Sequence, residues 1–197
     1  IPAPTGGWNA RDALTDMAPN DAIALDNLIP GALGCRLRNG YTSHGTGLGD
    51  QVESLMEYNA PDGTKVLFGA AGGVVWNVTT AGAATSSNTG FTNDRHQNVM
   101  FATTGGNFLV TCNGENDVQN YNGSAWSAPS ITGVTSSTLI NVAVHFSRLW
   151  FVQDDTLDAW YLGTAAVSGA ATKLPLGSLC KLGGKLLAIA SWTRDGG

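Results

Sequence analysis

Apolar residues after Gln51 fall in short runs that Gly, Asn and Asp interrupt. The runs are rich in Val, Thr, Phe and Trp, a composition and length typical of β-strands. Paired runs with turn residues between them predict three hairpins, over residues 65–79, 107–121 and 148–162, and a fourth that begins at Lys185. This pattern predicts an all-β chain.

The predicted hairpins recur at a nearly constant interval. They begin at Lys65, Asn107, Arg148 and Lys185, which are 42, 41 and 37 residues apart. A further apolar run precedes each hairpin, at residues 55–58, 99–102, 142–146 and 179–182. Units of about 40 residues with three or four strands are typical of β-propeller blades. We therefore expect about 3.5 propeller-like blades over residues 48–197.

A β-sandwich is the alternative fold, because it also contains short strands at even spacing. The regular recurrence along the chain favours the propeller. If the repeat is real, one strand of each blade has equivalent middle positions that should be largely buried. These positions are Leu67, Phe68, Leu109, Val110, Trp150, Phe151, Leu187 and Ala188.

Residues 1–47 have a different character and form a predicted N-terminal arm. Turn residues occur throughout this segment, and its apolar residues lack the regular period of an independent core. One patch favours a short helix: residues 19–21 offer a cap, five apolar residues follow, and Pro30-Gly31 ends the pattern. The arm is therefore expected to be irregular, with one short helix.

Charged residues make up 13% of the chain, and the formal net charge is −5. This balance argues against sequence-specific binding to duplex DNA and against docking on anionic lipid, since both need basic patches. No apolar stretch approaches the roughly 20 residues that cross a bilayer, and no export signal is visible. Three widely separated cysteines, Cys35, Cys112 and Cys180, favour reduced, buried thiols.

No motif in the sequence has the spacing that its chemistry requires. Residues 40–45 do not match a nucleophile elbow, and residues 45–50 lack the ending of a phosphate-binding loop. The cluster Asp154, Asp155 and Asp158 fits hairpin turns better than a calcium loop. We therefore expect that the protein is not an enzyme and has no catalytic residue, no cofactor and no metal site.

The alternative function comes from residues 193–197, Thr-Arg-Asp-Gly-Gly. This string resembles the Ser/Thr-x-Asp-x-Gly turn of sialidase-type propellers. It occurs once, and the arginines of the chain are too scattered to assemble the catalytic cluster of those enzymes. A glycan-binding or glycan-hydrolysing propeller is therefore the second hypothesis.

The most distinctive strings lie in the arm: residues 6–12 (GGWNARD), 17–22 (MAPNDA), 25–31 (LDNLIPG) and 36–40 (RLRNG). They resemble the N-terminal arm of tail proteins in tailed bacteriophages and prophages. In the related tail-tube or nozzle proteins of short-tailed phages, such an arm is followed by propeller-like repeats. The similarity covers the first 40 residues as motifs and the rest as architecture.

This resemblance implies a structural virion protein, made in the bacterial host cytoplasm and located in the phage tail. The subunits would form a homo-oligomeric ring that contacts the portal, the adaptor and other tail proteins. Double-stranded DNA would pass through the ring without sequence-specific binding, and no membrane is part of the particle. A low content of charge agrees with a subunit whose surface is largely interface, and a net acidic wall would not retain the passing phosphates.

The arm is expected to be an assembly element. Its apolar side chains are too many to be left to water, so they must pack on the blades or on another subunit. Arginines and aspartates lie close together in this segment, and Arg suits bidentate contacts with carboxylates. The predicted interface residues are Trp8, Arg11, Asp12, Asp26, Asn27, Arg36 and Arg38.

Overall fold

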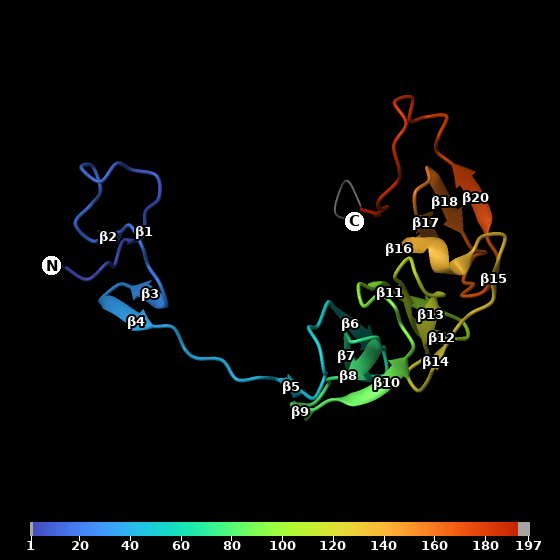
Figure 1. Ribbon diagram of the computed structural model, residues 1–197, viewed down its shortest axis with the longest axis horizontal. Helices are drawn as coiled ribbons and strands as arrows, with labels where there is room; N and C mark the ends of the chain where they lie inside the picture. The colour runs from blue at the N-terminus through green and yellow to red at the C-terminus, as the bar shows by residue number, and fades with distance from the viewer. Residues whose placement is uncertain (1, 193–197) are drawn as a thin grey trace. The chain divides into compact units, whose positions relative to one another are not determined.

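The computed structural model of the protein describes residues 2–192 and divides into two compact units, Ile1–Thr42 and Ser43–Gly197. The described residues form an all-β structure whose elements are shown in Figure 1. They contain no α-helix, and their one helical turn is the 3-10 segment Ser136–Thr138. None of these residues lies in a helix long and apolar enough to span a membrane.

Three four-stranded antiparallel sheets form the second unit. Sheet I contains β6 (Ser54–Asn59), β7 (Lys65–Ala71), β8 (Val74–Asn77) and β10 (Thr85–Thr89). Sheet II contains β11 (Gln97–Thr103), β12 (Gly106–Cys112), β13 (Gln119–Tyr121) and β14 (Trp126–Ser127). Sheet III contains β16 (Leu139–His145), β17 (Arg148–Gln153), β18 (Asp158–Tyr161) and β20 (Thr172–Pro175). Within each sheet the spatial order follows the chain, so the three predicted hairpins β7–β8, β12–β13 and β17–β18 are confirmed.

An aromatic core joins sheets I and II. Met56 and Phe68 are paired on β6 and β7, and both point to this core because alternate residues of a strand face opposite sides. Phe68 is fully buried and meets the rings of Tyr121 and Trp126 edge to face, at 4.9 and 5.1 Å between centroids. Such edge-to-face pairs add to the stabilisation that area burial gives.

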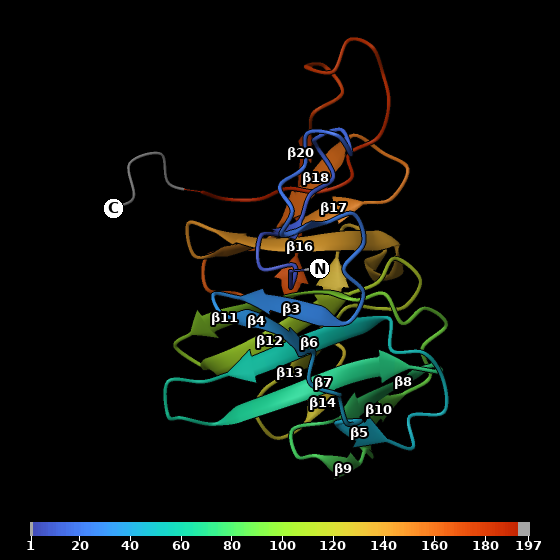
Figure 2. The same cartoon turned by 90° about the vertical axis from the view of Figure 1, so that its left-hand side faces the viewer.

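A second apolar core joins sheets II and III. Phe101 and Val110 from sheet II pack with Leu149 and Phe151 from sheet III, and all four are at most 3% exposed. Sheet II is therefore covered on both faces, and Figure 2 shows it between the other two sheets. This serial stacking differs from a two-layer sandwich, in which each sheet buries one face. Within residues 43–192 the three sheets do not close into a ring.

A short motif precedes each sheet at an exact interval of 43 residues. The triplets are Thr46-Gly47-Leu48, Thr89-Gly90-Phe91 and Thr132-Gly133-Val134. The central glycines have φ values of 79°, 91° and 93°, a region that side chains with a Cβ rarely adopt. Each triplet thus marks the same bend in the chain at the entrance to a sheet.

In two of these triplets, the threonine is part of a two-residue strand that pairs in parallel with another short strand. β5 (Gly45–Thr46) pairs with β9 (Gly82–Ala83), and β15 (Ile131–Thr132) pairs with β19 (Gly169–Ala170). In both cases the bridge ties the entering chain to the connection between the third and fourth strands of the sheet. The repeat therefore extends beyond the hairpins to the linkers.

The N-terminal unit contains two small pairs of strands. β1 (Gly7–Trp8) pairs in parallel with β2 (Asp21–Ala22), and β3 (Leu28–Gly31) forms a hairpin with β4 (Gly34–Leu37). The short helix expected between residues 19 and 31 is therefore wrong. A segment this short is a marginal helix in water, and strand pairing with residues 7–8 and 34–37 satisfies its backbone instead.

The fourth hairpin, expected from Lys185, is also wrong, because residues 179–192 contain no strand. Of the eight positions expected to be buried, Phe68, Leu109, Val110 and Phe151 are fully buried, and Leu67 and Trp150 are half-buried. Leu187 and Ala188 are exposed. Leu187 and Ala188 lie in a segment that forms no strand among the described residues, so they do not enter the core of a sheet.

Candidate assembly surfaces

A polar cluster fixes the first loop of the arm. The Asn9 side chain donates to Asp12 at 2.9 Å and to Asp21 at 2.8 Å. Its oxygen accepts the backbone N–H groups of Arg11 and Asp12. One amide therefore holds both ends of the loop between β1 and β2, a role that Asn performs well in turns.

Arg11 and Asp12 form an ion pair next to this cluster, with Nε 2.9 Å from Oδ1. The hydrogen bond from Arg11, with a further one from Asn9, lowers the pKa of the Asp12 carboxyl. The Arg11 side chain is 88% exposed, so the pair contributes little stability by itself. Its guanidinium stays accessible to a second carboxylate.

Several large apolar side chains of the arm are exposed to water. Trp8 is 69% exposed, although its indole N–H donates to the Ile23 carbonyl at 3.2 Å. Ile23 is itself exposed, and further exposed members of this set are Leu14, Leu33, Leu37 and Tyr41. The contact between Trp8 and Ile23 gathers part of this apolar surface at one place.

The remaining predicted interface residues lie around the β3–β4 hairpin. Asn27 adopts φ 57°, which Asn tolerates, and its carbonyl accepts the Arg38 N–H at 2.7 Å. Arg36, Arg38 and Asp26 have exposed side chains. Within residues 2–192 these three make no ion pair. The structure thus joins Arg11 to Asp12 and Asn27 to Arg38, and it leaves the other charges free for outside partners.

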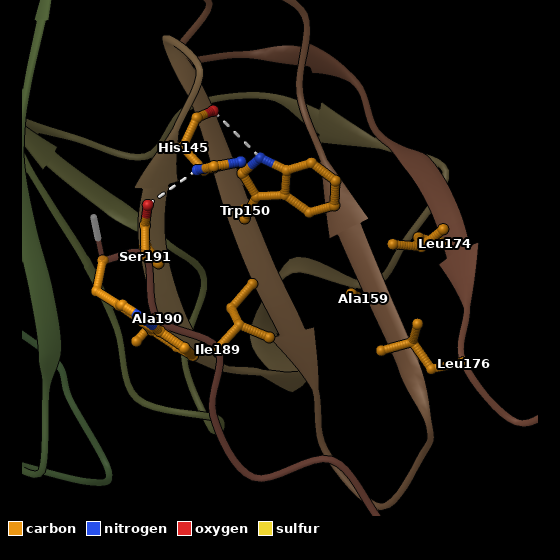
Figure 3. A pocket seen from close by; sticks show the side chains of 10 residues that line it. His145, Trp150, Ala159, Leu174, Leu176, Ile189, Ala190 and Ser191 are labelled. Atoms are coloured by element: carbon orange, nitrogen blue, oxygen red, sulfur yellow. Dashed lines mark hydrogen bonds between the residues drawn. The ribbon is translucent and has the colours of Figure 1, made fainter. Parts of the chain in front are cut away.

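Figure 3 shows a groove on the outer face of sheet III, which is the face turned away from sheet II. The volume of the groove is about 340 Å³. Trp150 and Ala159 form its floor, and Leu174 and Ile189 line its sides. The His145 ring nitrogen Nδ1 lies 2.9 Å from Ser191 Oγ at one end. Residues 189–192 form one wall, and just before them the Leu186 N–H donates to the Thr156 carbonyl.

The Ser191–His145 contact contains two of the three groups of a serine nucleophile site. Catalysis of that kind also needs a group that orients the base and donors that hold an oxyanion. In the described part of the chain no carboxylate is hydrogen-bonded to His145, and the lining is mainly apolar. Asp195, in the string that resembles a sialidase-type turn, lies outside the described residues.

A second groove, of about 320 Å³, lies on the outer face of sheet I. Gly69 forms the floor of this groove. Side-chain carbons of Val52, Leu55 and Leu48 lie 3.5 to 3.7 Å from the point that a Cβ atom of residue 69 would occupy. Leu55 is 62% exposed and Val52 is 39% exposed. The groove is thus an apolar depression open to water.

His96 is the one buried histidine of the described residues, at 5% exposure, and neither ring nitrogen has a partner there. Its ring packs edge to face on Phe91 between sheets I and II. Burial lowers the pKa of the imidazole to about 4, against the opposing attraction of Asp94. His96 therefore stays neutral and acts as a packing residue.

The three thiols are free, but they differ in exposure. Cys112 is buried, which raises its pKa to about 12, whereas Cys35 is half-buried and Cys180 is exposed. Burial of all three was therefore wrong. Among residues 2–192, no group of three or more His, Cys, Asp or Glu side chains is placed so that it could hold a metal ion.

Comparison of the chain with protein-family models, with curated proteins and with solved structures finds no match. The two grooves were missed by sequence reasoning. The 43-residue spacing of the Thr-Gly-apolar triplets was the signal that could have located Leu48, and hence the groove on sheet I.

Proposed function

We propose that this protein is a structural subunit of a bacteriophage tail, of the tube or nozzle kind, that assembles as a ring around the DNA exit channel. Its sheets I to III would be propeller-like blades. The observation that carries the proposal is the arm, which combines the four tail-protein-like strings with an exposed apolar surface, and whose described residues, 2–47, include no buried apolar side chain. Such a surface needs a partner to cover it.

The repeat unit supports the same proposal. Three sheets of the same design in series are a geometry suited to a scaffold, and the low charge of the chain suits extensive interfaces. In this proposal the arm contacts neighbouring subunits, the portal or the adaptor. Duplex DNA passes through the ring, repelled by a net charge of −5.

The experiment is immunogold labelling of tailed particles induced from the strain that carries the gene. Gold at the tail, together with loss of tails when the gene is deleted, is the expected result. Gold absent from the particle, with normal tails in the deletion strain, would contradict a virion role. Labelling with an antibody to the major capsid protein is the matched control.

Glycan binding stays the second proposal because the groove on sheet III offers aromatic and polar groups together. Trp150 stacks near Tyr161, with ring centroids 4.7 Å apart, and His145 and Ser191 supply hydrogen-bonding groups. A glycan array read with the purified chain distinguishes the proposals. Specific binding that Trp150→Ala abolishes would favour the glycan function.

A further inference from the structure

In two of the three triplets, the apolar residue lies at a seam, the contact between two successive sheets. Phe91 packs against the core between sheets I and II, and Val134 packs against the core between sheets II and III. Leu48 has the same place ahead of sheet I, 43 residues before Phe91. It lines the open groove on the outer face of that sheet instead of a core. Leu48 therefore has the position of a seam residue, but no second sheet packs on it within the described residues.

The outer face of sheet I has the other properties of a seam. Leu55 and Leu67 alternate with the core residues Met56 and Phe68, so they point away from sheet II. Gly69, which pairs with Leu55, leaves a depression that a side chain from another sheet can enter. Exposed apolar surface of this kind marks an interaction site.

The outer face of sheet III is the complementary end of the stack. Ala143 and Trp150 are paired, as are Ala159 and Leu174, and these alternate with the residues that face sheet II. Residues 189–192 add Ile189 and the 83% exposed Trp192 beside this face. Sheets I and II each use their corresponding face to cover the next sheet. Sheet III has such a face and no further sheet on it within the described residues.

Charge at the hairpin ends agrees with a meeting of these two faces. Arg148 lies on the outer face of sheet III, with its guanidinium 5.4 Å from the Tyr161 ring, and is paired with His145. On the outer face of sheet I the corresponding end carries Glu57, with Lys65 at the neighbouring strand end. The corresponding hairpin ends of sheets I and II meet within the chain, where the Tyr58 hydroxyl donates to the Asn107 carbonyl.

We propose that the outer face of sheet III in one copy docks on the outer face of sheet I in a second copy, head to tail. Leu48, Leu55 and Gly69 receive the partner, and Arg148 faces the second copy's Glu57. A contact between two different faces closes into a ring or extends as a filament. The inference deepens the proposed ring, and rests on the proposed function for the place of that ring in the particle.

The first test measures the mass of the full chain against concentration by sedimentation velocity. The wild type is expected to self-associate, and Leu55→Asp is expected to raise the dissociation constant at least about 30-fold, the effect of losing a central interface residue. Leu182→Asp is the matched control, because Leu182 is fully exposed and lies on neither face. Urea unfolding should be unchanged in both variants.

The second test exchanges charges. Glu57→Arg and Arg148→Glu should each weaken association, whereas an equimolar mixture of the two variants, or the double variant, should restore it. A symmetric contact of sheet I on sheet I would be weakened by Glu57→Arg alone. That result would overturn the proposal. So would a wild type that stays monomeric, or an equal effect of Leu55→Asp and Leu182→Asp.

The outcomes separate this contact from the proposed function. Gold at the tail with a chain indifferent to Leu55→Asp would leave the function and remove the contact. Head-to-tail association without gold at the tail would leave the contact and remove the function.

Discussion

Residues 2–42 and residues 43–192 carry apolar side chains of the same kinds, but only the second region buries them. Every buried hydrophobic side chain of the described residues lies between Met56 and Leu162. The arm instead depends on turns, two short strand pairs and the Asn9 cluster. Apolar burial supplies most of the stabilisation of a fold. The sheets therefore account for the stability of the protein, whereas the arm offers exposed apolar surface for contact with a partner.

The largest expected difference between the regions comes from removing one aromatic ring from each. Phe68→Ala empties a fully buried position between sheets I and II and should lower the free energy of unfolding by about 3 to 5 kcal/mol. Trp8→Ala, in the exposed arm, should change it by less than about 0.5 kcal/mol. Urea titration of both variants measures this. Similar losses would show that the arm is part of the folded core.

A pH titration tests the same core at His96. Its pKa is about 4 in the folded protein and 6.5 when unperturbed, so the unfolded chain binds more protons between these values. Stability should therefore fall as the pH is lowered from about 6.5 to about 4, by about 3 kcal/mol in total. His96→Phe should flatten this part of the profile. The exposed His145→Asn should retain it, and a profile that His145→Asn flattens instead would contradict the assignment.

A smaller effect distinguishes the glycines of the two regions. Gly90 has φ 91° with open space around it, so Gly90→Ala should cost about 1 to 2 kcal/mol from backbone strain alone. Gly40 has ordinary backbone angles and no neighbour within 4 Å, and Gly40→Ala should be nearly neutral. Thermal unfolding compares the two. Equal behaviour would remove the structural role given to the triplet bend.

The smallest expected effect on stability follows deletion of residues 1–40. The unfolding midpoint of the sheets should stay within about 2 °C, because the deletion removes no core side chain. Ring formation should be lost if the arm is the assembly element. Rings that form at the same concentration while the fold melts earlier would show that the arm only covers its own sheets.

The sheets could be predicted from sequence because their strands are adjacent in the chain. Turn residues between runs such as 65–71 and 74–77 define a hairpin locally, and the hydrophobic runs identify its core face. The arm could not be predicted in the same way. The pairing of Gly7 with Asp21 depends on contacts across a loop that has no regular period, and short apolar patterns do not distinguish a helix from a strand.

The fourth hairpin fails for a different reason. Residues 179–192 have the composition of strands, yet the positions expected to be buried need apolar surface on both sides of their sheet. The Leu186 N–H donates to the Thr156 carbonyl and the Ile189 N–H donates to the Asn141 side chain, both in the region of sheet III, while the Leu187 side chain is exposed to water. Local propensity is a weak prior that tertiary surroundings override.

The serial arrangement of the sheets also bears on how the chain is made. Each sheet is a meander of neighbouring strands, so its contacts are local and closing its short loops costs little conformational entropy. Synthesis from the amino terminus delivers sheet I first, with Met56 and Phe68 unprotected until sheet II emerges to cover them. During synthesis, the apolar face of the newest sheet therefore stays exposed until the next sheet has been made. The rate of translation sets how long that face can take part in aggregation.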